Sequence, residues 1–491
     1  MMPDCHRELL RIRDVLERRY RDMQDIEFTV ERGRLWMLQT RNGKRTGFAA
    51  VRIAVDMVRE GLIDRREALL RIDAEQLNRL LQPVFDPADK KRAVADKRLA
   101  AKGLAAGPGA ASGKTVFSAA KAVERAARGD KVVLVRLETS PEDIRGMMAA
   151  EGILTARGGM TSHAALVARQ MGKVCVAGCG DLEVDYAGSR FVARGGAVVR
   201  EGDEISIDGS TGEVFVGAIR TVSSEVKRVV LEKSPAPGDA PVFRMFAELM
   251  GWADEARRLQ VWTNADQPDQ AEQGLAFGAQ GIGLCRTEHM FFGEGKIGPM
   301  REMILADTME ERKRALAKLL PLQRKDFHGL FTAMSGRPVV IRTLDPPLHE
   351  FLPHDDKAIA ELAARMGVPA ERVRAKVAAL HEFNPMLGHR GCRLGISYPE
   401  VTAMQARAVV EAALDARRDG ADPQPEIMIP LVGHVEELRL QAKVVRSEAE
   451  AVFAERGERI RLRVGTMIEV PRGALTAGEV ASEAEFFSFG T

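Results

Sequence analysis

The sequence predicts an α/β protein of several domains that ends in an incomplete (β/α)8 barrel. A chain of 491 residues, 45% of them hydrophobic, is long enough for about three packed domains. Between residues 104 and 217, short strand-like runs alternate with short helical stretches. From residue 241 onward, seven strand-like runs alternate with long helical stretches, which is one repeat short of a closed barrel.

Composition excludes several classes of function. Lys+Arg 72 and Asp+Glu 70 nearly balance, so charge indicates neither a nucleic-acid nor a membrane role. The first residues carry charges instead of the apolar segment of a signal peptide, and no apolar run approaches membrane length. Five scattered cysteines suit a reducing cytoplasm. Cys175 and Cys179 lack the second ligand pair of a zinc site.

Residues 25–41 are expected to form a hairpin, because polar and apolar side chains alternate along them. This alternation places Asp25 and Glu27 on one face of the first strand, and Gln39 and Arg41 on one face of the return strand. Such a group can hold Mg²⁺ and nucleotide phosphates. Polar strand residues more often form a solvated sheet face, however, and spacing alone favours that alternative.

Two helices are expected over residues 47–83, where Gly61 fits a helix stop and Asp64 with Glu67 a capping box. The stretch 86–114 is rich in Ala, Lys, Gly and Pro, which is typical of a linker. An α/β unit follows, with strands expected at 132–135, 152–155, 173–176, 205–208 and 214–216. A second linker is centred on Ser234–Gly238. Two flanking linkers indicate a mobile unit; the alternative is that both pack against their neighbours.

His163 is the main candidate for catalysis in this unit. It follows the loop Gly158-Gly159-Met160-Thr161-Ser162 and precedes an apolar run typical of a helix, which Thr161 or Ser162 can cap. Free N–H groups at a helix N-terminus favour an anion. A neutral histidine placed there can attack a phosphoryl group and carry it. The alternative is a buried or capping histidine.

Charged residues follow several of the predicted barrel strands, which span 261–264, 281–285, 339–343, 391–396, 427–431, 464–468 and 486–490. Residues just past each strand line the active site of such a barrel. Arg286 and Arg342 can bind a carboxylate and a phosphate, and Glu469 a hard divalent cation. Gly490 and Thr491 likewise lie at the C-terminal end of a predicted strand, 486–490. Any one of these charges alone is more often a structural ion pair.

The histidine loop Gly158–His163 and the segments 23–29, 38–46, 283–292, 341–351, 384–393 and 465–469 together resemble the phosphoenolpyruvate-utilising enzymes. That family comprises pyruvate, phosphate dikinase, phosphoenolpyruvate synthase and enzyme I of the sugar phosphotransferase system. Met160 and the segment Asp345–His349 are most similar to the dikinase branch. The resemblance implies an ATP-grasp remnant at 1–46, a helical linker region at 47–100 and a swivelling phosphohistidine domain at 101–220. It further implies a linker at 221–240 and a truncated barrel at 241–491 that binds phosphoenolpyruvate or pyruvate.

The resemblance also implies residue roles. His163 carries the phosphoryl group, Glu469 binds Mg²⁺, and Thr161 is the target of a regulatory kinase and phosphatase. The substrate-binding residues are Arg286, Arg342, Arg390, Glu469, Gly490 and Thr491. The nucleotide-binding residues are Asp25, Glu27, Gln39 and Arg41.

The implied reaction interconverts ATP, phosphate and pyruvate with AMP, pyrophosphate and phosphoenolpyruvate, with Mg²⁺ as cofactor, in a cytoplasmic enzyme that is commonly dimeric. Phosphoenolpyruvate synthase or enzyme I is the close alternative, and a phosphocarrier module or inactive fragment is the alternative of another class. The family pattern begins before Met1 and continues past Thr491 with an Asn-Asp pair and, later, a proton-donating cysteine. We therefore expect residues 1–491 alone to lack the full activity.

Overall fold

The computed structural model describes residues 2–43, 45, 47–159, 162–171, 173–292, 295–353, 356–380, 384 and 387–490. The chain forms two compact units, residues 1–257 and 258–491, which are described separately. Among the described residues, no helix combines the length and the apolar character that a membrane span requires.

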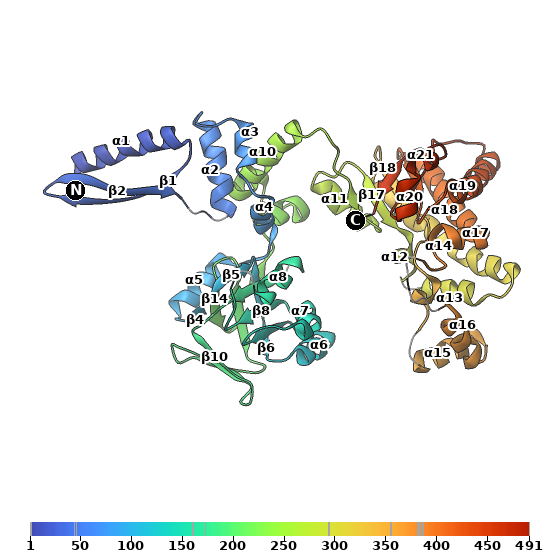
Figure 1. Ribbon diagram of the computed structural model, residues 1–491, viewed down its shortest axis with the longest axis horizontal. Helices are drawn as coiled ribbons and strands as arrows, with labels where there is room; N and C mark the ends of the chain where they lie inside the picture. Colours follow the sequence, from blue (N-terminus) through green and yellow to red (C-terminus); the bar gives the residue numbers. More distant parts are fainter. Residues whose placement is uncertain are drawn as a thin grey trace. The chain divides into compact units, whose positions relative to one another are not determined.

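The N-terminal hairpin is confirmed. Helix α1 (Pro3–Tyr20) lies along a two-stranded antiparallel sheet of β1 (Gln24–Glu31) and β2 (Arg34–Asn42) (Figure 1). Arg32 and Gly33 both have positive φ, 50° and 75°, as the two-residue turn of a tight hairpin requires.

A helical cluster follows the hairpin. It has three helices over 47–83 where the sequence predicts two: α2 (Gly47–Arg59), α3 (Arg65–Leu70) and α4 (Ala74–Leu81). Asp64 caps α3, as predicted, by accepting the N–H of Glu67 at 2.7 Å. The later helices α9 (Glu225–Lys227) and α10 (Pro241–Ala256) complete an apolar core that includes Val51, Val55, Val226, Leu249 and Trp252. The short segments η2 (Arg228–Glu232) and η3 (Pro237–Asp239) join them.

An eight-stranded sheet in the order β4-β14-β13-β6-β7-β8-β9-β5 forms the rest of this unit. Its strands are β4 (Leu99–Lys102), β5 (Leu104–Gly107), β6 (Ala110–Val116), β7 (Val132–Arg136), β8 (Gly152–Thr155), β9 (Val174–Ala177), β13 (Glu204–Asp208) and β14 (Glu213–Val216). Helices α6 (Ala119–Ala127), α7 (Ile144–Ala149) and α8 (His163–Gln170) contribute to the core on one face. The small sheet of β10 (Leu182–Asp185), β11 (Arg190–Ala193) and β12 (Val198–Arg200) contributes to a second core.

The predicted linker over 86–114 is wrong. That stretch contains α5 (Pro87–Ala95) and strands β4, β5 and most of β6. A short sheet of β3 (Val84–Phe85) and β15 (Thr221–Val222) pairs the segments that enter and leave the unit, and η1 (Pro141–Asp143) precedes α7.

The second unit contains six parallel strands in sequence order: β16 (Thr263–Asn264), β17 (Ile282–Arg286), β18 (Pro338–Arg342), β19 (Gln424–Ile429), β20 (Arg463–Ile468) and β21 (Phe487–Phe489). Sequential parallel pairing is the arrangement within a (β/α)8 barrel. The fourth of the seven predicted strands, 391–396, is wrong, because those residues form helix α17 (Gly391–Ser397). Strands β18 and β19 pair directly with each other.

The helices and strands of this unit bury two large apolar clusters and two smaller ones among the described residues. They are α11 (Pro268–Ala276), α12 (Thr287–Phe291), α13 (Ile297–Leu305), α14 (Met309–Ala333), η4 (Leu348–Phe351), α15 (Asp356–Met366), α16 (Ala370–Leu380), α17, α18 (Pro399–Arg418), α19 (Val435–Arg456), α20 (Pro471–Leu475) and α21 (Ala477–Val480).

Candidate functional site

The parallel register brings the predicted arginines to one edge of the second unit's sheet. Arg286 at the end of β17 pairs with Arg342 at the end of β18. Glu469 directly follows β20. Because parallel strands all end at the same edge, the three residues occupy the rim where barrel enzymes place their chemistry.

Arg342 lies in a buried cluster of opposite charges. Its Nη2 donates to Oε1 of Glu288, and its Nη1 lies 2.8 Å from Oδ2 of Asp345. Arg390, the residue before α17, donates from Nη2 to the same oxygen at 2.6 Å and from Nε to the Asp345 carbonyl at 3.1 Å. The side chains of Asp345 and Glu288 are only 3% and 8% exposed. The Asp345 carboxylate therefore links Arg342 to Arg390, the two arginines that the family resemblance gives as substrate-binding residues.

Some buried polar atoms of the cluster make no hydrogen bond to the described residues. Nε of Arg342, Oδ1 of Asp345 and Oε2 of Glu288 are buried and have no hydrogen-bond partner within the part of the chain that is described. An unpaired buried polar atom costs about 1–3 kcal/mol, and such atoms gather where a ligand completes the hydrogen bonding. Of the three atoms, Nε of Arg342 is a donor that an anionic ligand could accept from, whereas the two carboxylate oxygens suit a cation or a protonated group.

Glu469 is half-buried, and its Oε1 accepts the N–H of Leu431 at 2.8 Å. Burial raises the pKa of the Glu469 carboxyl, and the negative charge of Asp345 adds to the rise, whereas the Leu431 N–H, Arg342 and Arg390 oppose it. Gly490 packs directly against it, since a Cβ at Gly490 would lie 2.8 Å from Cβ of Glu469. Thr491 lies outside the described residues.

Arg286 is positioned through its backbone. Its N–H donates to Oδ1 of Asp266 at 2.6 Å, and Oδ2 of Asp266 lies 2.6 Å from Nδ1 of His289. Sequence reasoning missed Asp266, His289, Glu288 and the structural role of Asp345. The available signal was position, because each lies within a few residues of a predicted strand end.

The hairpin of the first unit brings the four predicted nucleotide residues together. Asp25 lies opposite Arg41, and Glu27 opposite Gln39. Arg41 Nε donates to Asp25 Oδ2 at 2.9 Å, and its Nη2 lies 3.4 Å from Glu27 Oε1. The three charged side chains are about half exposed. The four residues share one face of the hairpin, as predicted. Their exposure fits a solvated sheet face as well as it fits a nucleotide site.

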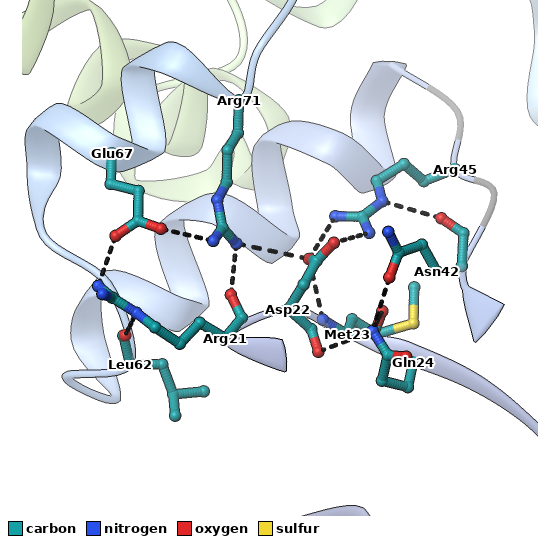
Figure 2. Close-up of polar contacts among 10 residues, drawn as sticks. Arg21, Asp22, Met23, Gln24, Asn42, Arg45, Leu62, Glu67 and Arg71 are labelled. Atoms are coloured by element: carbon teal, nitrogen blue, oxygen red, sulfur yellow. Dashed lines mark hydrogen bonds and ion pairs between the residues drawn. The ribbon is translucent and has the colours of Figure 1, made fainter. Parts of the chain in front are cut away.

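The base of this hairpin carries a separate network (Figure 2). Asp22 accepts hydrogen bonds from Nη1 and Nη2 of Arg45, at 3.0 and 2.9 Å, and from its neighbour's N–H, that of Met23, at 2.9 Å. Arg71, the C-cap of α3, approaches the same carboxylate at 3.6 Å. Sequence reasoning missed this network as well.

The histidine loop follows β8. Ser162 Oγ accepts the N–H of Ala165 at 3.4 Å, so Ser162 is the residue that caps α8, and α8 begins at His163. Gly158 has φ 105°, a backbone conformation that favours glycine. His163 thus lies at a helix N-terminus, as predicted. The description does not extend to its side chain, nor to Met160 and Thr161.

Metal ligands are sparse. The described residues contain no group of three or more His, Cys, Asp or Glu side chains that could hold an ion by themselves.

Three family models match the chain in sequence order. Residues 3–62 match the AMP/ATP-binding domain of pyruvate phosphate dikinase, residues 129–212 the mobile domain of PEP-utilising enzymes, and residues 243–491 the PEP-binding domain of those enzymes. Among curated proteins, the chain is 51% identical over 491 residues to pyruvate, phosphate dikinase of Clostridium symbiosum. It is 54% identical over 492 residues to that of Rhizobium meliloti (strain 1021) and 52% identical over 493 residues to the chloroplastic dikinase 1 of Arabidopsis thaliana.

These alignments cover all of this chain but only 54%, 52% and 49% of the three relatives. The chain spans about half the length of the relatives that it matches. The resemblance drawn from the motifs is confirmed.

Proposed function

The chain belongs to the phosphoenolpyruvate-utilising enzymes, and we propose that it supplies three working parts of a pyruvate, phosphate dikinase: a nucleotide-site hairpin, a phosphohistidine domain and a substrate-binding sheet edge. The observation that carries the proposal is the buried cluster of Arg342, Arg390 and Asp345 at the strand ends of the matched PEP-binding domain. In it, Nε of Arg342 and Oδ1 of Asp345 have no partner among the described residues. The net reaction converts ATP, phosphate and pyruvate into AMP, pyrophosphate and phosphoenolpyruvate.

His163 is the group that travels between the two half-reactions. Its Nε2 attacks a phosphoryl group derived from the nucleotide, and the bond to the leaving phosphate oxygen breaks. The phosphohistidine then transfers the group to the enolate oxygen of pyruvate, whose methyl group has lost a proton, and the neutral imidazole is restored. The position of His163 at the N-terminus of α8 supports this role, because the N-terminus of a helix favours negative charge such as that of the phosphoryl oxygens.

Arg342 and Arg390 bind the carboxylate and phosphate of the substrate, and Arg286 joins them from the neighbouring strand. Asp345 orients both of the buried guanidiniums. Gly490, which lies beside Glu469, and the following Thr491 contribute backbone groups. Guanidiniums suit this task because their planar N–H donors match carboxylate and phosphate oxygens.

Glu469 fits the role of a Mg²⁺ anchor. In proteins Mg²⁺ is commonly held by one or two carboxylates together with substrate phosphates and waters. The rim offers a half-buried carboxylate, Glu469, and the unpaired Oδ1 of Asp345 close to the arginines. When bound, Mg²⁺ supplies positive charge that stabilises the phosphoryl group and the enolate.

The remaining parts of the proposal concern nucleotide, regulation and assembly. Asp25, Glu27, Gln39 and Arg41 contact ATP phosphates and a second Mg²⁺. Phosphorylation of Thr161 by a regulatory kinase would add about −2 charge beside His163 and block phosphoryl transfer. The proposed domains are those of the sequence analysis, except that α10 packs in the core of the first unit, so that the incomplete barrel would begin after Arg257. The proposed enzyme is dimeric and cytoplasmic. The five cysteines of the chain are buried and form no disulfide, which suits a reducing compartment.

The test uses a full-length protein that contains these residues. Incubation with phosphoenolpyruvate labelled in its phosphate should leave an acid-labile, base-stable label on the protein, and AMP with pyrophosphate should remove it as ATP and phosphate. Turnover from ATP and pyruvate should require added phosphate. A label that resists acid, or turnover without phosphate, would show that the proposed reaction is wrong.

A further inference from the structure

The base of the β1–β2 hairpin is joined to the helical cluster by five charged residues, here called the Asp22 network: Arg21, Asp22, Arg45, Glu67 and Arg71 (Figure 2). We propose that Asp22 is a positioning residue for the nucleotide half-reaction. It fixes the orientation of the hairpin that carries the four nucleotide-site residues. The inference rests on the proposed function, and it assigns a role to a residue outside the site itself.

The Asp22 carboxylate joins both ends of the hairpin. Asp22 precedes β1 and holds the N–H of Met23. Arg45 follows β2 and reaches back to both carboxylate oxygens, while its Nε donates to the Gly43 carbonyl at 3.1 Å. Beside them, Gln24 donates to Oδ1 of Asn42 at 2.9 Å. Hydrogen bonds and ion pairs therefore join the segment before β1 to the segment after β2 at the base of the hairpin.

Arg71 connects this closed base to helix α3. Its Nη1 donates to the Arg21 carbonyl at 2.5 Å and lies 3.6 Å from Asp22 Oδ1, and its Nη2 donates to Glu67 Oε1 at 2.6 Å. Arg21, in a left-handed conformation with φ 53° after α1, donates to the other oxygen of Glu67 at 2.5 Å. The ions thus link α1, the hairpin and α3 in one network.

Apolar packing does not fill this junction. A cavity of about 450 Å³ lies beside the network, lined by Tyr20, Asp22, Asn42, Arg45, Ala50, Ile53, Ala54, Met57, Arg71 and Ile72. The side chains of Asp22, Arg45 and Arg71 are 21%, 19% and 27% exposed, so the charges are partly shielded from water. The orientation of the hairpin at this point depends on the ion network more than on close contact.

A small rotation of the hairpin about its base would displace the nucleotide-site residues by a distance that matters for catalysis. Glu27 is five residues beyond Asp22, about 16 Å along an extended strand. A rotation of roughly 10° at the base would displace Glu27 and its partner Gln39 by about 3 Å, whereas a misplacement of about 1 Å can cost 100-fold in rate. Loss of Asp22 should therefore slow nucleotide chemistry without unfolding the protein.

The experiment compares Asp22→Asn with wild type in the full-length protein, with Asp14→Asn as the matched control. Asp14 lies on α1, pairs with the adjacent Arg13 at 2.6 Å and has a side chain that is 48% exposed. Two partial reactions are measured separately: release of pyrophosphate and AMP from ATP and phosphate, and exchange between labelled pyruvate and phosphoenolpyruvate. Hydrogen exchange of the backbone over residues 21–25 provides a readout independent of activity.

We expect Asp22→Asn to lower the single-turnover rate of the nucleotide partial reaction about 10- to 100-fold, to leave pyruvate exchange within twofold of wild type, and to accelerate hydrogen exchange at the hairpin base. Asp22→Glu should recover part of the nucleotide rate, and Asp14→Asn should match wild type. Unchanged nucleotide kinetics in Asp22→Asn, or an equal fall in both partial reactions, would overturn the inference. A wild-type protein without nucleotide chemistry would instead overturn the proposed function, and the inference with it.

Discussion

Replacing Asp345 with asparagine should destabilise the second unit, because this carboxylate is the shared partner of two arginines. Asp345 is 3% exposed in its side chain and lies 2.8 Å from Arg342 and 2.6 Å from Arg390. The amide has nearly the same shape but no charge. Removing one partner of a buried ion pair typically costs about 3–5 kcal/mol.

The lower end of that range is expected here. Arg342 keeps its contact with Glu288, and Arg390 keeps the Asp345 carbonyl, so neither guanidinium is left wholly uncompensated. A change of about 3 kcal/mol in the free energy of unfolding corresponds to a fall in Tm of roughly 6–12 °C for a unit of this size. Pyruvate exchange should also slow, because both arginines lose their orienting group.

Differential scanning calorimetry of Asp345→Asn measures the effect, with Asp419→Asn as the control. Asp419 pairs with His328 at 2.8 Å, but its side chain is 66% exposed, and exposed pairs contribute about 0–1 kcal/mol. A Tm for Asp345→Asn within about 2 °C of the Asp419→Asn value would refute the argument that the arginines depend on the buried carboxylate.

Three further predictions concern the proposed sites. Burial raises the pKa of Glu469 above its ordinary value of 4.5, so the charge on this carboxylate opposes folding above the raised pKa. Glu469→Gln should therefore have a higher Tm than wild type at neutral pH, and this difference in Tm should vanish below about pH 4. The rate of Mg²⁺-dependent pyruvate exchange should fall at least about 10-fold in the same variant. Equal Tm at pH 7 would contradict this sign. His163→Ala should retain no label from phosphoenolpyruvate while its thermal unfolding stays like that of wild type, and a retained label would assign the phosphoryl group elsewhere. Gly490→Ala should push Glu469 aside, since the new Cβ would lie 2.8 Å from its Cβ, and should therefore slow pyruvate exchange more than the nucleotide partial reaction; equal slowing of both would contradict it.

The hairpin and several strands were predictable from sequence because local physics specifies them. Alternation over 25–41 and turn residues at positive φ predict β1 and β2. Apolar runs such as 152–155 match β8 to the residue. In each case the pattern is short-range, so the rest of the chain was not needed to recognise it.

The wrong prediction of a linker over 86–114 has a physical reason. The small residues of this stretch resemble those of a linker, yet they are required where strands approach closely. A Cβ at Gly107 would lie 2.4 Å from the Lys173 carbonyl, and one at Gly113 would lie 2.8 Å from the Lys131 carbonyl. A glycine selected by tertiary contact looks the same in sequence as one selected for flexibility.

The segment 391–396 misled because it is short and mostly apolar, and such runs do not distinguish a buried strand from a short helix. Gly391 has φ 57° and starts the seven-residue helix α17. Its Cβ would meet Leu431 at 3.0 Å. That contact comes from a residue 40 positions away, so no local pattern could reveal it.

Charge balance at the rim explains why the arginines alone do not complete the proposed site. Arg342 and Arg390 are offset by Asp345 and Glu288, and Glu469 adds a further negative charge. The phosphate and carboxylate of phosphoenolpyruvate together carry roughly three negative charges. Binding such a ligand in a partly buried site requires extra positive charge, since uncompensated buried charge costs several kcal/mol. Arg286 supplies one unit, and a divalent cation anchored on Glu469 would supply two more, which leaves about one negative charge of the roughly four. The carboxylates that orient the arginines therefore create the need for the cation, which is why removing magnesium should weaken substrate binding more than it weakens the fold.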